Sequence, residues 1–211
     1  MKRLAILGAS GHGKVVADTA ECCGWQTIEF FDDAWPERQH NGSWAVVGDT
    51  AALHERLQMF DGVVVAIGNN VIRYSKLLEL EAAGACLCSL VHPAATVSRY
   101  AVLEKGTVVF AQAVVNADVH IGLGGILNTG CSVDHDCVLG AAVHISPGAR
   151  LAGGVNVGNL SWVGIGASVR QLVRIGAQVV VGAGAAVTTD VADALTVVGV
   201  PARALANRQA T

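Results

Sequence analysis

The chain has 211 residues, a formal charge of −3 and a pI near 6.1, so it lacks the basic excess that nucleic acids or anionic membranes attract. No apolar run approaches the ~18 residues that cross a bilayer, and the apolar stretch near the N-terminus runs into a glycine-rich turn, which argues against a signal peptide. The six cysteines include no C-x-x-C pair and no metal-type cluster with histidine. We therefore expect reduced thiols, no bound metal and a cytoplasmic protein.

The first part of the chain alternates predicted strands with predicted helices. The strands are expected at residues 3–7, 27–31 and 61–67, and the helices at residues 14–23 and 71–83. This alternation indicates a small parallel sheet with helical crossovers. Because the region is too short for a complete dinucleotide fold, we expect a Rossmann-like α/β domain over residues 1–88.

Polar residues and glycines follow each of the three predicted strands. These segments are Gly8-Ala-Ser-Gly-His-Gly13, Asp32-Asp33 and Gly68-Asn69-Asn70. Ligands of such sheets bind beyond the carboxyl ends of the strands, and a glycine-rich turn before a helix can present backbone amides to a phosphate. A nucleotide site is therefore predicted here. A plain tight turn, with two solvated aspartates after the second strand, is the alternative.

The second part of the chain has a six-residue period. From Val91, every sixth residue is Val, Ile or Leu for seventeen consecutive positions up to Val187, and the next step falls on Asp193. A run of this length arises by chance with a probability of about 10⁻⁷. A triangular coil with one inward aliphatic residue per face has this period, and the residue two positions earlier also points inward. Residues 91–187 are therefore predicted to form about five coils of a parallel β-solenoid, within a domain of residues 89–211.

Four glycines recur at a spacing of eighteen residues, each directly after a ladder residue: Gly122, Gly140, Gly158 and Gly176. Glycine adopts backbone angles that other residues avoid. We therefore expect these four glycines at the tight corners of the coil, with unusual backbone angles.

A histidine between two carboxylates, Asp134-His135-Asp136, interrupts the coil at an outward position. Acyl transfer to an amine or a hydroxyl requires a base, and a neutral histidine suits this task near neutral pH. A carboxylate on the second ring nitrogen would fix the tautomer of the histidine. The sequence leaves open which aspartate does so, and a simple surface His–Asp pair is the alternative.

The chain resembles the hexapeptide-repeat acyltransferases and, among them, the bacterial nucleotide-amino-sugar N-acetyltransferases of the PglD type. The segments that carry the resemblance are Gly8-Ala-Ser-Gly-His-Gly13, Asp32-Asp33, Ala66-Ile-Gly-Asn-Asn70, Leu127-Asn-Thr129, His135-Asp-Cys137, His144, Ala152-Gly153 and Val198-Gly-Val-Pro-Ala202. The resemblance implies a left-handed parallel β-helix and a homotrimer with active sites between subunits. It also implies transfer of an acetyl group from acetyl-CoA to the 4-amino group of a nucleotide-linked 4-amino-4,6-dideoxy sugar, and we expect the nucleotide to be UDP.

The resemblance further implies residue roles. His135 would be the general base, and Asp136 would orient it; a member of the family has Glu at the position of Asp136. Asn128 would lie near the base and the sugar. Contacts with acetyl-CoA are implied for His144, Gly153, Ile165 and Gly182. Contacts with the nucleotide sugar are implied for Gly11, His12, Gly13, Asp32, Asp33, Gly68 and Asn69.

Three other functions compete with this one. A γ-class carbonic anhydrase shares the solenoid, but the spacing of His120, His135 and His144 does not match its zinc ligands. A sugar O-acetyltransferase of the sialic acid type shares both domains and differs in its hydroxyl acceptor. A non-catalytic scaffold that only binds nucleotide predicts no release of CoA.

Overall fold

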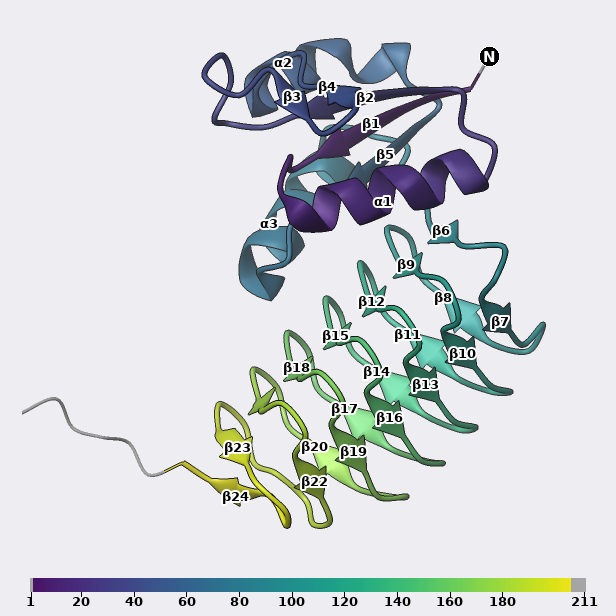
Figure 1. Ribbon diagram of the computed structural model, residues 1–211, viewed down its shortest axis with the longest axis vertical. Coiled ribbons are helices and arrows are strands. Elements are labelled where there is room, and N and C mark those ends of the chain that lie inside the picture. Colours follow the sequence, from purple (N-terminus) through teal and green to yellow (C-terminus); the bar gives the residue numbers. More distant parts are fainter. Residues whose placement is uncertain (1, 206–211) are drawn as a thin grey trace, which may run out of the picture.

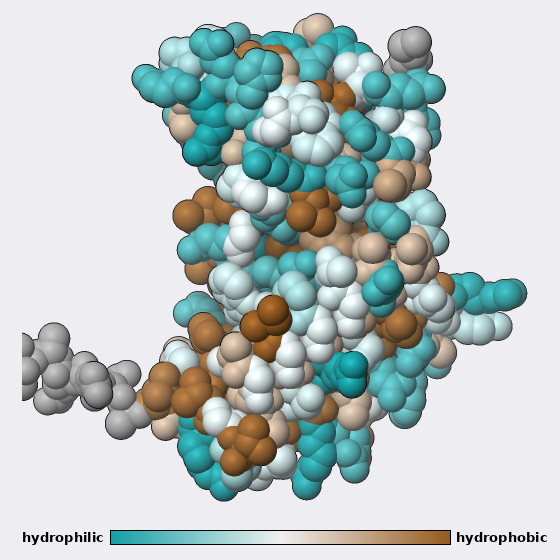
Figure 2. Space-filling view, in the orientation of Figure 1, coloured by the Kyte–Doolittle hydropathy of each residue, from teal (hydrophilic) through white to brown (hydrophobic). Residues whose placement is uncertain are grey.

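The computed structural model describes residues 2–205 and joins an α/β unit to one end of a triangular β-solenoid (Figure 1). Residues 206–211, which belong to the expected second domain, lie outside the described residues. Among the described residues, no helix is long and apolar enough to cross a membrane. In the space-filling view, hydrophilic side chains predominate on the α/β unit, while hydrophobic ones gather toward the far end of the solenoid (Figure 2).

The α/β unit is built on a three-stranded parallel sheet in the order β2-β1-β5. One face of the sheet packs against α1, and the other face packs against α2 and α3. The predicted strands and helices are confirmed, whereas α2 and a short hairpin were not predicted. The elements are β1 (Arg3–Leu7), α1 (Gly11–Cys22), β2 (Thr27–Phe31), β3 (His40–Asn41), β4 (Trp44–Ala45), α2 (Thr50–Arg56), the 3₁₀ turn η1 (Leu57–Met59), β5 (Gly62–Val65) and α3 (Asn70–Ala82).

Helix α1 begins at Gly11, three residues earlier than predicted, so that half of the glycine-rich turn is helical. Gly13 is buried in its first turn, where a Cβ atom would collide with the carbonyl oxygen of Gly8 and lie 3.0 Å from the ring of Phe30. Gly8 itself has a φ of 109°, which favours glycine. The glycines therefore serve the close packing of the helix start on the sheet.

The solenoid consists of two-residue strands that pair in parallel with the strands eighteen residues before and after them. His144, for example, pairs with Ile126 and Trp162. The strands form three sheets, as predicted for a triangular coil. The first sheet contains β6 (Leu90–Val91), β9 (Val108–Val109), β12 (Ile126–Leu127), β15 (His144–Ile145), β18 (Trp162–Val163) and β21 (Val180–Val181). The second contains β7 (Thr96–Val97), β10 (Val114–Val115), β13 (Ser132–Val133), β16 (Arg150–Leu151), β19 (Ser168–Val169) and β22 (Ala186–Val187). The third contains β8 (Val102–Leu103), β11 (His120–Ile121), β14 (Val138–Leu139), β17 (Asn156–Val157) and β20 (Arg174–Ile175).

The six-residue ladder forms the core of the solenoid from Val109 to Val187, where each ladder side chain is buried. Its first three members depart from the prediction: Val91 is 36% exposed, and Val97 and Leu103 are half-buried. These residues belong to the first coil, which has a neighbouring coil on one side only. The row two positions earlier is buried from Thr107 to Ala185.

The expected role of the four spaced glycines is wrong. Gly122, Gly140, Gly158 and Gly176 lack positive φ angles, and each lies where one coil closely approaches the next. A Cβ atom at Gly122 would lie 2.9 Å from the backbone nitrogen of Ala141. The left-handed conformation instead falls on another six-residue series, which includes non-glycine residues: Gly106, Gln112, Asp118, Gly124, Gly130, Asp136, Ala142, Gly148, Gly154, Leu160, Gly166, Leu172, Gln178 and Gly184.

The solenoid continues beyond the end of the sequence ladder. Val191 bridges Ile175, and Val197 of β23 (Thr196–Val198) pairs with Val181, so the last coil has sixteen residues where the others have eighteen. The six-residue step misses this coil because two residues are absent from it. The antiparallel strand β24 (Arg203–Ala204) then pairs with β23.

Candidate active site

His135 lies at the corner between β13 and β14, with its side chain exposed. Its Nδ1 atom lies 2.6 Å from Oδ2 of Asp136, which occupies the left-handed corner position with a φ of 60°. Asp134 instead accepts hydrogen bonds from the backbone N–H of His135, at 2.9 Å, and from Nδ2 of Asn116, at 2.7 Å. The structure therefore answers the question that the sequence left open: Asp136 holds the imidazole, and Asp134 holds the backbone.

The two carboxylates raise the pKa of His135 above its ordinary value. The hydrogen bond to Asp136 makes the largest contribution, followed by the charge of Asp134. A ring whose Nδ1–H donates to Asp136 has an unprotonated Nε2 in its neutral form, as a general base requires.

The imidazole of His135 lies directly over Gly153. A Cβ atom at Gly153 would lie 2.5 Å from Cε1 and 2.6 Å from Nε2 of the ring, so only glycine leaves room for it. An open cleft of about 420 Å³ surrounds the ring and includes the exposed side chain of Leu172. The sequence predictions for His135, Asp136 and Gly153 thus converge on one place.

A second group of predicted residues meets on the first sheet of the solenoid. Asn128, His144, Ile165 and Gly182 line an apolar groove of about 520 Å³ that runs over neighbouring coils. Trp162, which was not predicted from the sequence, stacks on the ring of His144 with centroids 4.8 Å apart and donates from Nε1 to Oγ of Ser146 at 2.6 Å. The groove suits a long, thin and largely apolar ligand.

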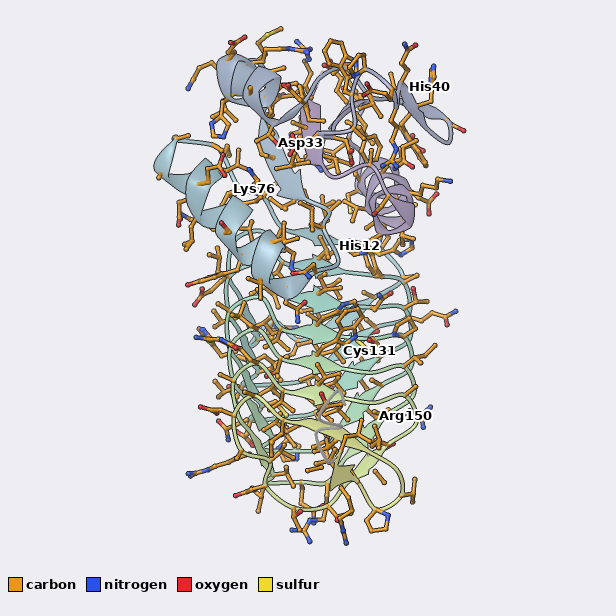
Figure 3. The ribbon with its side chains drawn as sticks, turned by 90° about the vertical axis from the view of Figure 1, so that its left-hand side faces the viewer. His12, Asp33, His40, Lys76, Cys131 and Arg150 are labelled. Atoms are coloured by element: carbon orange, nitrogen blue, oxygen red, sulfur yellow. The ribbon has the colours of Figure 1, made fainter. Side chains whose placement is uncertain are left out.

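His12 reaches the junction between the α/β unit and the solenoid (Figure 3). Its ring packs edge-on against Phe110, with centroids 5.6 Å apart, and lies 6.4 Å from the ring of His144. Burial, reinforced by the charge of Arg73, lowers the pKa of His12 to about 4 and that of His144 to about 3. Both rings are therefore neutral at neutral pH.

The nucleotide site predicted beyond the strand ends corresponds to a pocket of about 320 Å³. Asp32, Asp33 and Gly68 line it together with Thr50 and Lys76, and Figure 3 shows Asp33 and Lys76 on one side of the unit. Thr50 and Lys76 were not predicted from the sequence, because neither belongs to a glycine-rich or acidic segment.

Not every predicted nucleotide-site residue lines this pocket. Gly11 is exposed at the start of α1, Gly13 is buried in the first turn of that helix, and Asn69 caps α3 by accepting from the N–H of Ile72. Asp32 lines the pocket but also organises the loops: its Oδ2 accepts from the N–H of Ala9 at 2.6 Å, and its Oδ1 from that of Ala34 at 3.0 Å.

Within one chain, His135 and the apolar groove are apart. His135 lies at the corner between the second and third sheets, whereas Asn128, His144 and Trp162 belong to the first sheet and its following corner. Asn128 accordingly contacts His144, at 3.1 Å, and no hydrogen bond joins it to His135 in the described part of the chain.

A parallel β-solenoid with a His–Asp pair at a corner and an apolar groove across its coils defines an acyltransferase of the hexapeptide-repeat class. The comparisons with known proteins narrow this class. Residues 3–79 match the family model of the PglD N-terminal domain. The acetyltransferase domain of PglB from Neisseria gonorrhoeae, solved with acetyl coenzyme A, is 43% identical, with 97% of this chain and 99% of that chain covered and a TM-score of 0.93.

A variant of perosamine N-acetyltransferase from Caulobacter crescentus, solved with CoA and GDP-perosamine, is 39% identical over 98% of both chains, with a TM-score of 0.93. UDP-N-acetylbacillosamine N-acetyltransferase of Bacillus subtilis is 36% identical over 114 residues, a match that spans about half of each protein: 53% of this chain and 52% of that one. The chain therefore belongs to the PglD-type family of acetyl-CoA-dependent N-acetyltransferases that act on nucleotide amino sugars, and its solenoid is the left-handed β-helix of that family.

Proposed function

We propose that this chain transfers the acetyl group of acetyl-CoA to the 4-amino group of a UDP-linked 4-amino-4,6-dideoxy sugar. The observation that carries the proposal is the exposed imidazole of His135, held at 2.6 Å by Asp136 and lying over Gly153. Residues 1–88 serve as the nucleotide-binding domain, and the solenoid from residue 89 onward serves as the acyl-transfer domain. The cytoplasm is the proposed location, since six free cysteines suit a reducing compartment.

In the proposed reaction, the amine nitrogen bonds to the carbonyl carbon of the thioester and the carbon–sulfur bond breaks. Nε2 of His135 takes the proton that the amine loses, and Asp136 stabilises the resulting imidazolium. The imidazolium then gives this proton to the departing thiolate of CoA, so that the products are an amide and a free thiol and His135 is neutral again. The apolar groove beside His144, which includes Ile165 and Gly182, holds the pantetheine arm of acetyl-CoA.

The separation of His135 from the groove supports a homotrimer in which each active site uses two subunits. In this arrangement, the corner with His135 of one subunit faces the groove with His144 of its neighbour. A closed ring of three copies then contains three equivalent sites.

Mixed trimers test this arrangement. His135→Ala and His144→Ala variants are each expected to be nearly inactive, but their co-expression should restore activity at about a quarter of the sites, because random mixing pairs the two intact residues at that frequency. Sites built within single chains would regain no activity on mixing.

A screen for thiol release tests the reaction itself. Acetyl-CoA is incubated with UDP-, GDP- and dTDP-linked 4-amino sugars and with the matching 4-hydroxy sugars, and free CoA is measured. We expect release of CoA with the 4-amino sugars, and most rapidly with the UDP-linked ones. Release only with a hydroxy sugar would indicate an O-acetyltransferase, and no release with any acceptor would indicate a non-catalytic scaffold.

A further inference from the structure

Helix α3 lies along the solenoid and follows one column of its corners. Asn70 donates from Nδ2 to the carbonyl oxygens of Leu160, at 3.0 Å, and Ser161, at 3.1 Å. One helical turn later, Arg73 reaches the corners of the two preceding coils. This match is possible because a helical turn advances ~5.4 Å and neighbouring coils are ~4.8 Å apart.

The next turn of α3 explains why two corners in the same column contain glycine. Leu77 occupies the space where a Cβ atom of Gly106 or Gly124 would lie, at 2.8 Å from the former position. Asn70, Arg73 and Leu77, at spacings of three and four residues, therefore form one face of α3 that is fitted to successive coils.

Arg73 is 1% exposed, and its guanidinium makes five hydrogen bonds. Nε donates to Gly124 O at 2.9 Å, and Nη2 donates to Ala142 O at 2.7 Å, both in the solenoid. Nη1 donates to Ile67 O at 3.0 Å and to Gly68 O at 3.1 Å, both in the loop after β5. Nη2 also donates to Oδ1 of Asn70 at 2.9 Å.

The loop that Arg73 holds is part of the nucleotide pocket. Ile67 and Gly68 line that pocket, and so do Ile72 and Lys76 on the outer side of α3. The buried guanidinium of Arg73 thus connects one wall of the nucleotide pocket with two coils of the solenoid. The strands that follow these two corners belong to the sheet that contains His144.

We propose that Arg73 is a positioning residue that sets the distance and angle between the nucleotide pocket and the acyl-transfer face. This inference rests on the proposed function. A sugar tethered to a diphosphate reaches the thioester only from a nucleotide site at a fixed place, and small displacements of reacting groups cost large factors in rate. The planar five-donor fork of arginine satisfies carbonyl oxygens of both domains at once, which the ammonium of lysine does not.

Arg73→Lys and Arg73→Met are the test variants, with Arg56→Lys as the control. Arg56 contacts Glu29 within the α/β unit and lies away from the junction. For both Arg73 variants, we expect kcat with the nucleotide amino sugar to fall about 10²-fold. The dissociation constant of acetyl-CoA, measured by calorimetry, is expected to stay within about threefold of wild type. That of UDP, measured separately, is expected to rise by no more than about tenfold, because the loop that Arg73 holds is only one wall of the nucleotide pocket.

Hydrogen exchange provides a readout that does not depend on activity. In Arg73→Lys, the amides of residues 67–73 are expected to exchange faster, while those of the solenoid core keep their protection. A kcat within about threefold of wild type would overturn the proposal, as would a parallel loss of kcat and of UDP binding. Wild-type protein, assayed in the same experiment, separates this result from failure of the proposed function, which would appear as inactivity of wild type with every acceptor.

Discussion

Asn128 fixes the tautomer of His144. The Oδ1 atom of Asn128 accepts from the backbone N–H of Thr129 at 2.8 Å, so its Nδ2 atom is the one that lies 3.1 Å from Nε2 of His144. Because Nδ2 can only donate, Nε2 accepts, and the single proton of the neutral ring resides on Nδ1. That Nδ1 atom is buried without a hydrogen-bond partner among the described residues, so its N–H is an unsatisfied donor there.

Replacing Asn128 with Asp is expected to reverse this relationship. A carboxylate only accepts, so Nε2 of His144 must become protonated, and the ring either changes tautomer or becomes charged. Nitrogen-15 NMR of His144 should show protonation moving to Nε2, and kcat should fall about 10²-fold as the polarity of the site inverts. Asn156→Asp adds the same charge at an exposed position of the solenoid and is the matched control. An unchanged His144 spectrum in Asn128→Asp would contradict the assignment.

The pH dependence of catalysis should report the pair of His135 and Asp136. A general base acts in its unprotonated form, so kcat/KM is expected to rise with pH through a pKa above the ordinary histidine value, because Asp136 raises the pKa of His135. Asp136→Asn removes the largest cause of that shift. The rising limb should therefore move to lower pH, and the plateau should fall because a weaker base accepts the proton less readily. A rising limb at the same pH in both proteins would show that this histidine does not govern the profile.

Gly153→Ala should lower activity by displacing the ring of His135, although His135 itself is unchanged. The added methyl group requires the space of Cε1 and Nε2 of His135, so the ring must turn away from the cleft. A displacement of this size is expected to lower kcat about 10²-fold. Thermal unfolding should change little, because the exposed ring moves rather than the core. A variant with wild-type kcat would show that the position of the ring over Gly153 is unimportant.

The sequence predicted the fold well because the solenoid repeats one simple packing rule. A buried aliphatic residue on each face produces a period that no helix or hairpin shares, so Val109 to Val187 could be assigned from spacing alone. The shortened last coil was missed because it breaks the period while keeping the strand pairing of Val197 with Val181.

The site was predicted only in part. His135, with its flanking carboxylates, departs visibly from an inert coil. The resemblance grouped Gly153 with the acetyl-CoA contacts of His144, whereas the structure places it against the ring of His135. Arg73 and Trp162 gave no such signal: an arginine in a helix is ordinarily solvent-exposed, and the spacing does not show that α3 lies along the coils. Which side of the solenoid each residue occupies depends on the corner where it falls, so the separation of His135 from Asn128 became evident only in three dimensions.

The half-buried His12 and the buried His144 make the stability of the protein sensitive to mild acid. His12 and His144 titrate in the unfolded chain near the ordinary value of 6.5, whereas burial lowers their pKa in the folded protein to about 4 and about 3. Below pH 6.5 the unfolded chain therefore binds protons that the folded protein excludes, and the free energy of unfolding should fall as pH decreases toward 4, by on the order of 2–3 kcal/mol per histidine.

Urea unfolding at pH 7 and pH 5 measures this loss. His12→Gln should reduce the difference between the two pH values, whereas His40→Gln, at an exposed position, should leave it unchanged. An equal pH dependence in wild type and His12→Gln would mean that the ring of His12 is accessible to protons in the folded protein.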